Sequence, residues 1–269
     1  MGSFPLAIAK AARRSGARVH CIAIRDLADP AIEQEVEGIT WIQLGEAAKG
    51  VAAFTSAGVK QVVMAGKVPK DLLFRGDKPV EFDATGSLVM GKLEDRKDDT
   101  ILGAVASFME TLGIEVLPQW ALAPELLVGP ETLGSVRPTE AQEADIAFGF
   151  PLAKRYGQLD IGQTIVVKDR AVLAVEAIEG TDATIRRAGE IAPGACVVKV
   201  EKHGQDPRFD VPTIGVETIR SLVAARASVL AFEAGVTVVL DREGLAREAD
   251  AHGIAVVGVD PERLAQEIQ

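Results

Sequence analysis

Residues 40–66 read TWIQLGEAAKGVAAFTSAGVKQVVMAG, and this stretch decides the fold of the first half of the chain. Its pattern predicts a strand at Thr40–Leu44, a helix at Glu46–Ala57 that ends at Gly58, and a strand at Gln61–Ala65. A helix that connects two short apolar strands is the crossover unit of a parallel sheet. The stretch therefore predicts parallel strands with helices packed on them.

The same alternation continues on both sides of this unit. A helix is expected at Phe4–Ser15, where Pro5 lies in the first turn, and a buried strand follows at Arg18–Ile24. Further along, a helix that begins at the Asp98-Asp99 pair leads to a strand at Ile114–Leu117. The first half therefore predicts a Rossmann-like parallel-sheet domain over residues 1–133.

Two features of this first half are irregular. A doubly wound unit begins with a strand, yet the first predicted helix follows Met1 almost at once. Either Met1 is an internal start, which we favour, or the domain lacks its usual first strand. If Met1 is an internal start, the sheet should have an unfilled position beside Arg18–Ile24. Residues 67–97 are polar and too long for a simple connection, so they are expected to form a functional loop region.

The pattern changes in the second half. A helical connector is expected over residues 134–159, with its helix interrupted by a glycine and a proline. Strands are expected at Gln163–Lys168 and Ala171–Ile178, and the two residues between them predict a hairpin. Another strand pair is expected about Gly235. Antiparallel pairs combined with helices predict a separate α+β domain over residues 160–269, so the whole chain is predicted to be α/β with two domains.

Composition narrows the class of protein. Hydrophobic residues make up 48% and charged residues 25% of the 269 residues, as in a folded protein. The net charge of −10 argues against a nucleic-acid binder, which needs a basic surface. Cys21 and Cys196 lie in apolar runs and are expected to be buried free thiols, which fits a reducing cytoplasm. No apolar run reaches the length of about 18 residues that spans a membrane.

Several common motifs are missing from the sequence. The chain contains no GxGxxG, Walker loop, CxxC or HExxH pattern. Classical NAD enzymes, P-loop ATPases and zinc proteases therefore lose most of their support.

The first segment that could carry chemistry is EAIEGTD at residues 176–182. Glu176 and Glu179 end a strand, and Thr181 and Asp182 open a helix. Carboxylates facing a helix N-terminus could hold Mg²⁺ and, through it, phosphate oxygens. The alternative is that Asp182 only caps the helix and the glutamates are solvated.

The second segment is KVEKHGQDPRFDVPTIG at residues 199–215. Asp206 and Asp210 bracket Arg208 in a stretch stiffened by two prolines. Pyrophosphate cleavage needs cations that neutralise phosphate and carboxylates that bind Mg²⁺ or orient water. A solvated loop would also explain the charges, and His203 is either an acid–base group or a bystander.

Two weaker segments could bind a diphosphate. Gly66 and Lys67 follow a buried strand, and ligands of open α/β sheets lie beyond the carboxyl ends of strands. Gly2 and Ser3 precede the first helix, whose N-terminal N–H groups could bind an anion.

The segments taken together resemble one known family. MAGKV at 64–68, RPTE at 137–140, DIGQ at 160–163, VEAIEGTD at 175–182, the 199–215 segment and VLAFEAG at 229–235 look like the successive signature blocks of LpxI-type UDP-2,3-diacylglucosamine pyrophosphatases. The similarity covers essentially the whole chain. One departure is that the family has a strand and a glycine-rich turn before the residues that match Gly2–Pro5.

The resemblance implies a two-domain cytoplasmic enzyme of lipid A biosynthesis with its substrate between the domains. With Mg²⁺ it would hydrolyse UDP-2,3-diacylglucosamine, a lipid-bearing UDP-sugar, to UMP and 2,3-diacylglucosamine 1-phosphate (lipid X). Transient contact with the inner membrane is expected, and a homodimer is left open. The implied catalytic residues are Asp210, Asp206 and Lys199, and the implied metal ligands are Asp182, Glu176 and Glu179. The implied substrate contacts are Gly2, Ser3, Phe4, Gly66, Lys67, Thr181, Lys202, Gln205, Arg208 and Thr213.

Two other functions stay open at this point. A non-enzymatic nucleotide or UDP-sugar binding protein would bind the ligand without needing the carboxylates. A dehydrogenase with an atypical cofactor loop would bind NAD, for which the sequence has no fingerprint.

Overall fold

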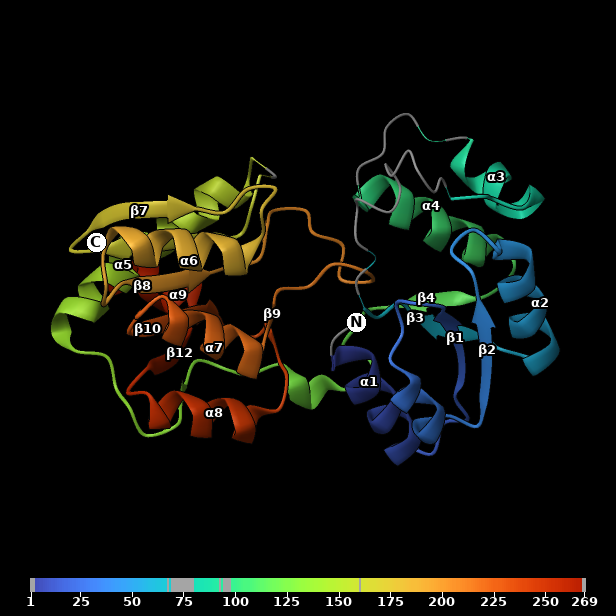
Figure 1. The fold of residues 1–269 in the computed structure, drawn as a ribbon, viewed down its shortest axis with the longest axis horizontal. Coiled ribbons are helices and arrows are strands. Elements are labelled where there is room, and N and C mark those ends of the chain that lie inside the picture. Colours follow the sequence, from blue (N-terminus) through green and yellow to red (C-terminus); the bar gives the residue numbers. More distant parts are fainter. Residues whose placement is uncertain are drawn as a thin grey trace. The chain divides into compact units, whose positions relative to one another are not determined.

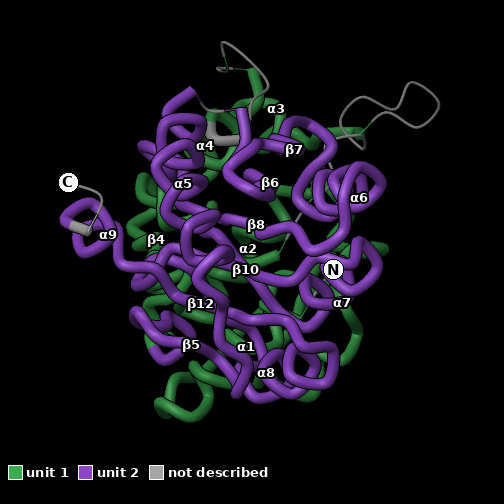
Figure 2. Tube along the Cα trace, turned by 90° about the vertical axis from the view of Figure 1, so that its left-hand side faces the viewer, with its two compact units in different colours: residues 1–124, 206–210 green, residues 125–205, 211–269 purple. Residues whose placement is uncertain are grey.

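The computed structural model describes residues 3–66, 68, 80–91, 93, 98–159 and 161–267. Among the predicted site residues, Gly2 and Lys67 lie outside these ranges. The chain forms two compact units (Figure 2): unit 1 contains Met1–Pro124 and Asp206–Asp210, and unit 2 contains Glu125–Gln205 and Val211–Gln269. The units thus divide after Pro124 rather than after residue 133, and a short piece of the second half packs with the first.

Unit 1 contains two pairs of parallel strands. Strand β1 (His20–Ile24) pairs with β2 (Gly38–Ile42), and β3 (Gln61–Val63) pairs with β4 (Glu115–Leu117). The remaining elements of this unit are helices: α1 (Phe4–Arg14), η1 (Pro30–Glu35), α2 (Ala47–Ala57), α3 (Ala84–Met90) and α4 (Asp98–Thr111). Gly58 ends α2 with φ 66°, in the left-handed region that favours glycine.

The strands and helices predicted for the first half are therefore present, but their sheet differs from the prediction. Within the described residues β1 pairs only with β2, and β3 only with β4, so a single Rossmann-like sheet stays a prediction. The unfilled position expected beside Arg18–Ile24 likewise stays a prediction.

Helix α3 corrects the expectation of a loop region for residues 84–90, while most of the rest of 67–97 lies outside the described residues. Its N-cap is Asp83, whose carboxylate accepts hydrogen bonds from Gly86 N at 2.7 Å and from Ala48 N at 2.8 Å. These two bonds hold the pKa of Asp83 below its usual value. An aspartate at the N-cap accepts hydrogen bonds from backbone N–H groups that the start of a helix leaves unpaired. The composition of the segment did not indicate this helix.

Unit 2 is built on a six-stranded mixed sheet (Figure 1) with the order β5-β12-β10-β8-β6-β7. Strands β8 (Cys196–Lys199), β10 (Val229–Glu233) and β12 (Ala255–Val259) are parallel. Antiparallel pairing adds β5 (Thr132–Leu133) on one side, and β6 (Thr164–Lys168) with β7 (Ala171–Val175) on the other. A separate parallel pair joins β9 (Thr213–Ile214) to β11 (Val238–Val239).

Helices cover both faces of this sheet and form two cores. Helix α5 (Glu140–Gly157) packs on one face through Ile146, Phe150 and Ala153. Helices α6 (Thr181–Ile191), α7 (Val216–Ala224) and α8 (Arg242–Ala251) pack on the other face. The remaining described elements are η3 (Pro124–Leu126) and α9 (Pro261–Glu267). No described helix has both the length and the apolar character needed to cross a membrane.

The predicted strand pair about Gly235 is wrong. Val229–Glu233 pairs in parallel with β8 and β12, while Val238–Val239 pairs with β9. Because helices cover both faces, β10 is buried along its whole length, which is typical of a parallel strand. The centre of unit 2 is therefore a parallel α/β layer with antiparallel strands at its edges, rather than α+β.

The β6–β7 hairpin is confirmed. Asp169 and Arg170 have φ of 50° and 57°, and a two-residue turn with φ positive at both positions matches the twist of the strands. The carboxylate of Asp145 stabilises this turn by accepting hydrogen bonds from the N–H groups of Asp169 and Arg170. Two residues that rarely adopt positive φ are thereby held in it.

Helix α5 is continuous and belongs to unit 2, so residues 134–159 do not form a separate connector. It begins at Thr139, where a capping box with Gln142 satisfies the first backbone donors. Gly149 lies where an added Cβ would be 3.0 Å from a methyl of Val167. The glycine therefore allows close approach to the sheet instead of interrupting the helix, and Pro151 lies within the helix.

Candidate active site

One edge of the unit 2 sheet brings chemically active side chains together. The parallel strands β8, β10 and β12 all end at this edge, and β6 begins there because it runs antiparallel to β8. Strand β7 ends at the same edge. Ligands of open α/β sheets bind beyond such strand ends, and here Glu176, Lys199 and Glu233 occupy them.

Glu176 follows β7 and is buried, with 8% of its surface exposed. Its Oε1 accepts a hydrogen bond from the Thr181 hydroxyl at 3.0 Å, and the Thr181 hydroxyl also lies 3.3 Å from that of Thr164. Its other carboxylate oxygen, Oε2, is buried and has no hydrogen-bond partner among the described residues. A buried acceptor without a partner is costly, so this atom is suited to accept a donor from a ligand.

Lys199 ends β8 and is also buried, with 6% of its surface exposed. It is paired with Thr164 across the antiparallel ladder, which places both side chains on the same face of the sheet. Its Nζ donates to the carbonyl oxygen of Thr213 at 2.9 Å. The fold therefore collects predicted residues that lie far apart in sequence, namely Glu176, Thr181, Lys199 and Thr213.

The other two predicted metal ligands turn toward different partners. Glu179 binds Arg187 at 2.7 Å, and its own backbone N–H together with Arg187 holds the pKa of its carboxyl below the usual value. Asp182 accepts a hydrogen bond at 2.8 Å from the hydroxyl of Ser221 on α7. Within the described ranges no group of three His, Cys, Asp or Glu residues could hold a metal ion. Glu176, Glu179 and Asp182 thus do not fit a shared Mg²⁺ site.

The segment Asp206–Asp210 packs within unit 1. Phe209 is buried in a cluster with Ala106 and Val116, and Gln119 N donates to the carbonyl oxygen of Pro207 at 2.7 Å. Although this segment lies among the residues of unit 2 in sequence, an apolar anchor and a backbone bond tie it to the first half of the chain.

Arg208 is held by two carboxylates of unit 1. Its guanidinium donates to both oxygens of Asp206 at 2.7–3.0 Å, and its Nη1 lies 2.7 Å from Glu110 Oε1. The side-chain hydrogen bonds from Arg208 hold the pKa of Asp206 below its usual value. Asp210 N donates to the carbonyl oxygen of Asp206 at 3.0 Å, which closes a compact turn. The predicted charged residues of this segment therefore lie in one hydrogen-bonded turn.

The remaining predicted contacts differ in their surroundings. Gln205 Oε1 accepts from Lys202 N at 3.0 Å, while its buried Nε2 has no hydrogen-bond partner in the described part of the chain. Ser3 is the N-cap of α1, but its side chain makes no capping hydrogen bond. Phe4 is buried, so its side chain packs inside unit 1. Gly66 has φ 105°, a conformation that favours glycine.

Sequence reasoning missed several residues at this edge of unit 2. Thr164 contacts Thr181, the hydroxyl of Tyr156 donates to the carbonyl oxygen of Glu176 at 2.5 Å, and Lys154 forms an ion pair with Glu233. Glu233 could have been found, because a carboxylate at the end of the apolar run VLAFE stands where α/β sheets bind ligands. Nothing in the local sequence marks Lys154 or Tyr156, which lie on a helix.

Comparison with known proteins covers nearly the whole chain. The family model described as the LpxI N-terminal domain matches residues 1–126, and that of the LpxI C-terminal domain matches residues 130–257. The UDP-2,3-diacylglucosamine pyrophosphatase LpxI of Caulobacter vibrioides is 33% identical over 273 aligned residues. The alignment covers 97% of this chain and 95% of that relative. The junction between the two matches falls close to the division between units 1 and 2.

Proposed function

The chain belongs to the LpxI family, and from this membership we propose that it hydrolyses the pyrophosphate bond of UDP-2,3-diacylglucosamine. The products would be UMP and 2,3-diacylglucosamine 1-phosphate, an intermediate of lipid A synthesis. The observation that carries the proposal is the 33% identity to a UDP-2,3-diacylglucosamine pyrophosphatase over 97% of the chain.

The described residues supply groups that this reaction needs. A buried ammonium at Lys199 and a guanidinium at Arg208 can neutralise the charge that develops on phosphate oxygens. Asp210 lies in a turn closed by a backbone hydrogen bond, where a carboxylate can orient the attacking water. Thr181 opens helix α6, and its contact with Glu176 fixes the start of that helix beside the strand ends.

Mg²⁺ dependence is part of the proposal and rests on the family resemblance. Mg²⁺ would neutralise phosphate charge when bound. Among the described residues, the three predicted ligands do not form a shared site for the ion. The proposal also keeps a Rossmann-like arrangement of the first half and transient contact with a membrane surface, where a diacylated substrate resides.

Purified protein incubated with UDP-2,3-diacylglucosamine and MgCl₂ is expected to release UMP and 2,3-diacylglucosamine 1-phosphate in equal amounts. EDTA should suppress this release, and added Mg²⁺ should restore it. Both products can be followed by chromatography with mass detection. Binding of the UDP-sugar without UMP release would favour the binding-protein alternative, whereas binding of NAD would favour the dehydrogenase.

Arg208→Ala is expected to lower kcat/KM by about 10- to 100-fold, with KM raised as well as kcat lowered. A charge-assisted hydrogen bond contributes about 1.5–3 kcal/mol, and a cation attracts a diphosphate in both the ground state and the transition state. The substitution also releases the carboxylates of Asp206 and Glu110 from their ion pairs, which adds repulsion. Steady-state kinetics measure both parameters.

The matched control for Arg208→Ala is Arg220→Ala, which removes another arginine that pairs with two glutamates, Glu217 and Glu248. That variant should retain wild-type kinetics. If Arg208→Ala also kept wild-type KM and kcat, Arg208 would have only a structural role.

A further inference from the structure

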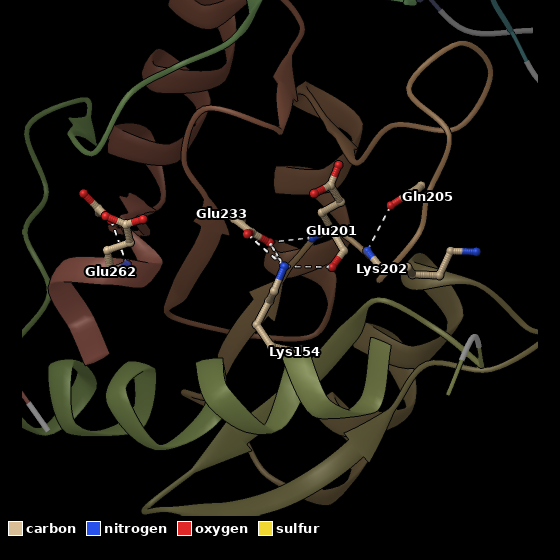
Figure 3. A network of polar contacts seen from close by, with 7 residues as sticks. Lys154, Glu201, Lys202, Gln205, Glu233 and Glu262 are labelled. Atoms are coloured by element: carbon tan, nitrogen blue, oxygen red, sulfur yellow. Dashed lines mark hydrogen bonds and ion pairs between the residues drawn. The ribbon is translucent and has the colours of Figure 1, made fainter. Parts of the chain in front are cut away.

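The chain just beyond strand β8 is held by polar contacts that the proposed chemistry does not use (Figure 3). Lys154 Nζ, from α5, lies 2.9 Å from both carboxylate oxygens of Glu233 at the end of β10. The same Nζ donates to the carbonyl oxygen of Glu201 at 3.2 Å, and Glu201 N donates to Glu233 Oε2 at 2.8 Å. The ion pair therefore binds both backbone polar groups of one residue, Glu201.

The position of Glu201 explains why side chains take this role. The ladder between β8 and β10 ends at the pair formed by Lys199 and Phe232, so Glu201 lies beyond it. Buried backbone N–H and carbonyl groups beyond the end of a strand need partners other than the neighbouring strand. Glu233 is 5% exposed, and the Lys154 side chain is 35% exposed. A buried ion pair adds little net stability compared with apolar packing, so what this pair contributes is partners for the backbone groups of Glu201.

Glu201 lies between predicted site residues of the same unit. Lys199 lies two residues before Glu201, and Lys202 and Gln205 follow it in a turn closed by the bond from Lys202 N to Gln205 Oε1. Val200 N, immediately before Glu201, donates to the carbonyl oxygen of Gln163 at 3.0 Å. Backbone groups of Val200, Glu201 and Lys202 are therefore all hydrogen-bonded. The two groups of Glu201, its N–H and its carbonyl oxygen, bind Glu233 and Lys154.

We propose that Lys154 and Glu233 are positioning residues for the reaction: they hold the backbone of Glu201 so that Lys199 and Lys202 are correctly placed. This inference rests on the proposed function, since it assigns a purpose to the placement of these lysines. Neither side chain needs to touch the substrate. A displacement of about 1 Å in a positioned group can lower a rate by about 10²-fold, so a contact of this kind affects turnover more than binding.

The test is a double variant, K154M/E233Q, which removes both charges and so leaves no unpaired buried ion. We expect kcat to fall about 10- to 50-fold while KM changes less than threefold. Hydrogen exchange followed by mass spectrometry should show faster exchange in peptides that contain residues 200–205. Lys154→Arg, which keeps the charge and can still bind Glu233, should restore most of kcat.

The matched control is R242M/E131Q, which removes an exposed ion pair from the same unit. It should leave both kcat and the exchange of residues 200–205 unchanged. If K154M/E233Q does not fold, Glu233→Asp replaces it, because this variant keeps the charge but withdraws the carboxylate by one methylene; it should show the same loss of kcat in weaker form.

The outcomes separate this inference from the proposed function. Absence of hydrolysis by the wild-type protein would overturn the proposed function, and the positioning role would fall with it. Hydrolysis by the wild type together with wild-type kcat in both K154M/E233Q and Glu233→Asp would overturn the positioning role alone. A lower melting temperature with unchanged kcat would likewise show that the ion pair only stabilises the unit.

Discussion

Asp210→Ala is expected to lower kcat by about 10² to 10⁴ while KM holds or falls. A carboxylate that orients water acts mostly in the transition state, so its loss should affect turnover far more than binding. The change also removes a negative charge near an anionic pyrophosphate, which should favour the ground-state complex. Steady-state kinetics and the melting temperature of the same preparation provide the measurement.

The alternative for Asp210 is a purely local role in its turn, whose backbone bond joins Asp210 N to the carbonyl oxygen of Asp206. In that case Asp210→Ala would lower the melting temperature and leave kcat nearly intact. Glu243→Ala is the matched control, because it removes a carboxylate that is 89% exposed on α8. The control should match wild type in both measurements.

Lys199→Met is expected to lower kcat/KM by about 10² to 10³, the usual effect of losing one group that stabilises charge in a transition state. Methionine keeps the length and the apolar stem of the side chain, so the buried site stays filled. The carbonyl oxygen of Thr213 loses its donor, but an ammonium no longer needs to be buried. Because these effects oppose each other, the melting temperature should change little.

Lys168→Met is the matched control for Lys199→Met. Lys168 ends the neighbouring strand β6, and its Nζ also donates to a backbone carbonyl, that of Pro193. It lies at the end of β6 remote from the position paired with Lys199. The control should keep wild-type kcat/KM. Equal losses in the two variants would mean that the assay reports general damage to unit 2 rather than a role of Lys199 in the reaction.

Local sequence was sufficient for most of the secondary structure. Apolar runs such as Cys196–Val200 predict strands because short buried segments favour such residues, and Gly58 ends α2 where positive φ is required. The sequence also indicated the 199–215 segment and the blocks shared with the LpxI family. For these features the deciding information lies within a few neighbouring residues.

Other features depended on residues far apart in the chain. The parallel pairing of Val229–Glu233 was mistaken for half of a hairpin, because a buried strand has the same composition whichever neighbour it pairs with. The helix through Gly149 and Pro151 was expected to break, because its stability comes from packing on the sheet.

The candidate site, too, has features that the local sequence determines and features that depend on residues far apart in the chain. The sequence by itself determined which carboxylates and cations are available between Glu176 and Asp210. Only the tertiary structure decided that Glu176 meets Thr181 while Asp182 turns to Ser221, and that the ion pair of Lys154 and Glu233 holds Glu201. Residue type and local propensity are properties of short segments, whereas the partner of a buried polar group is decided by whichever distant segment the packed core brings within hydrogen-bond distance.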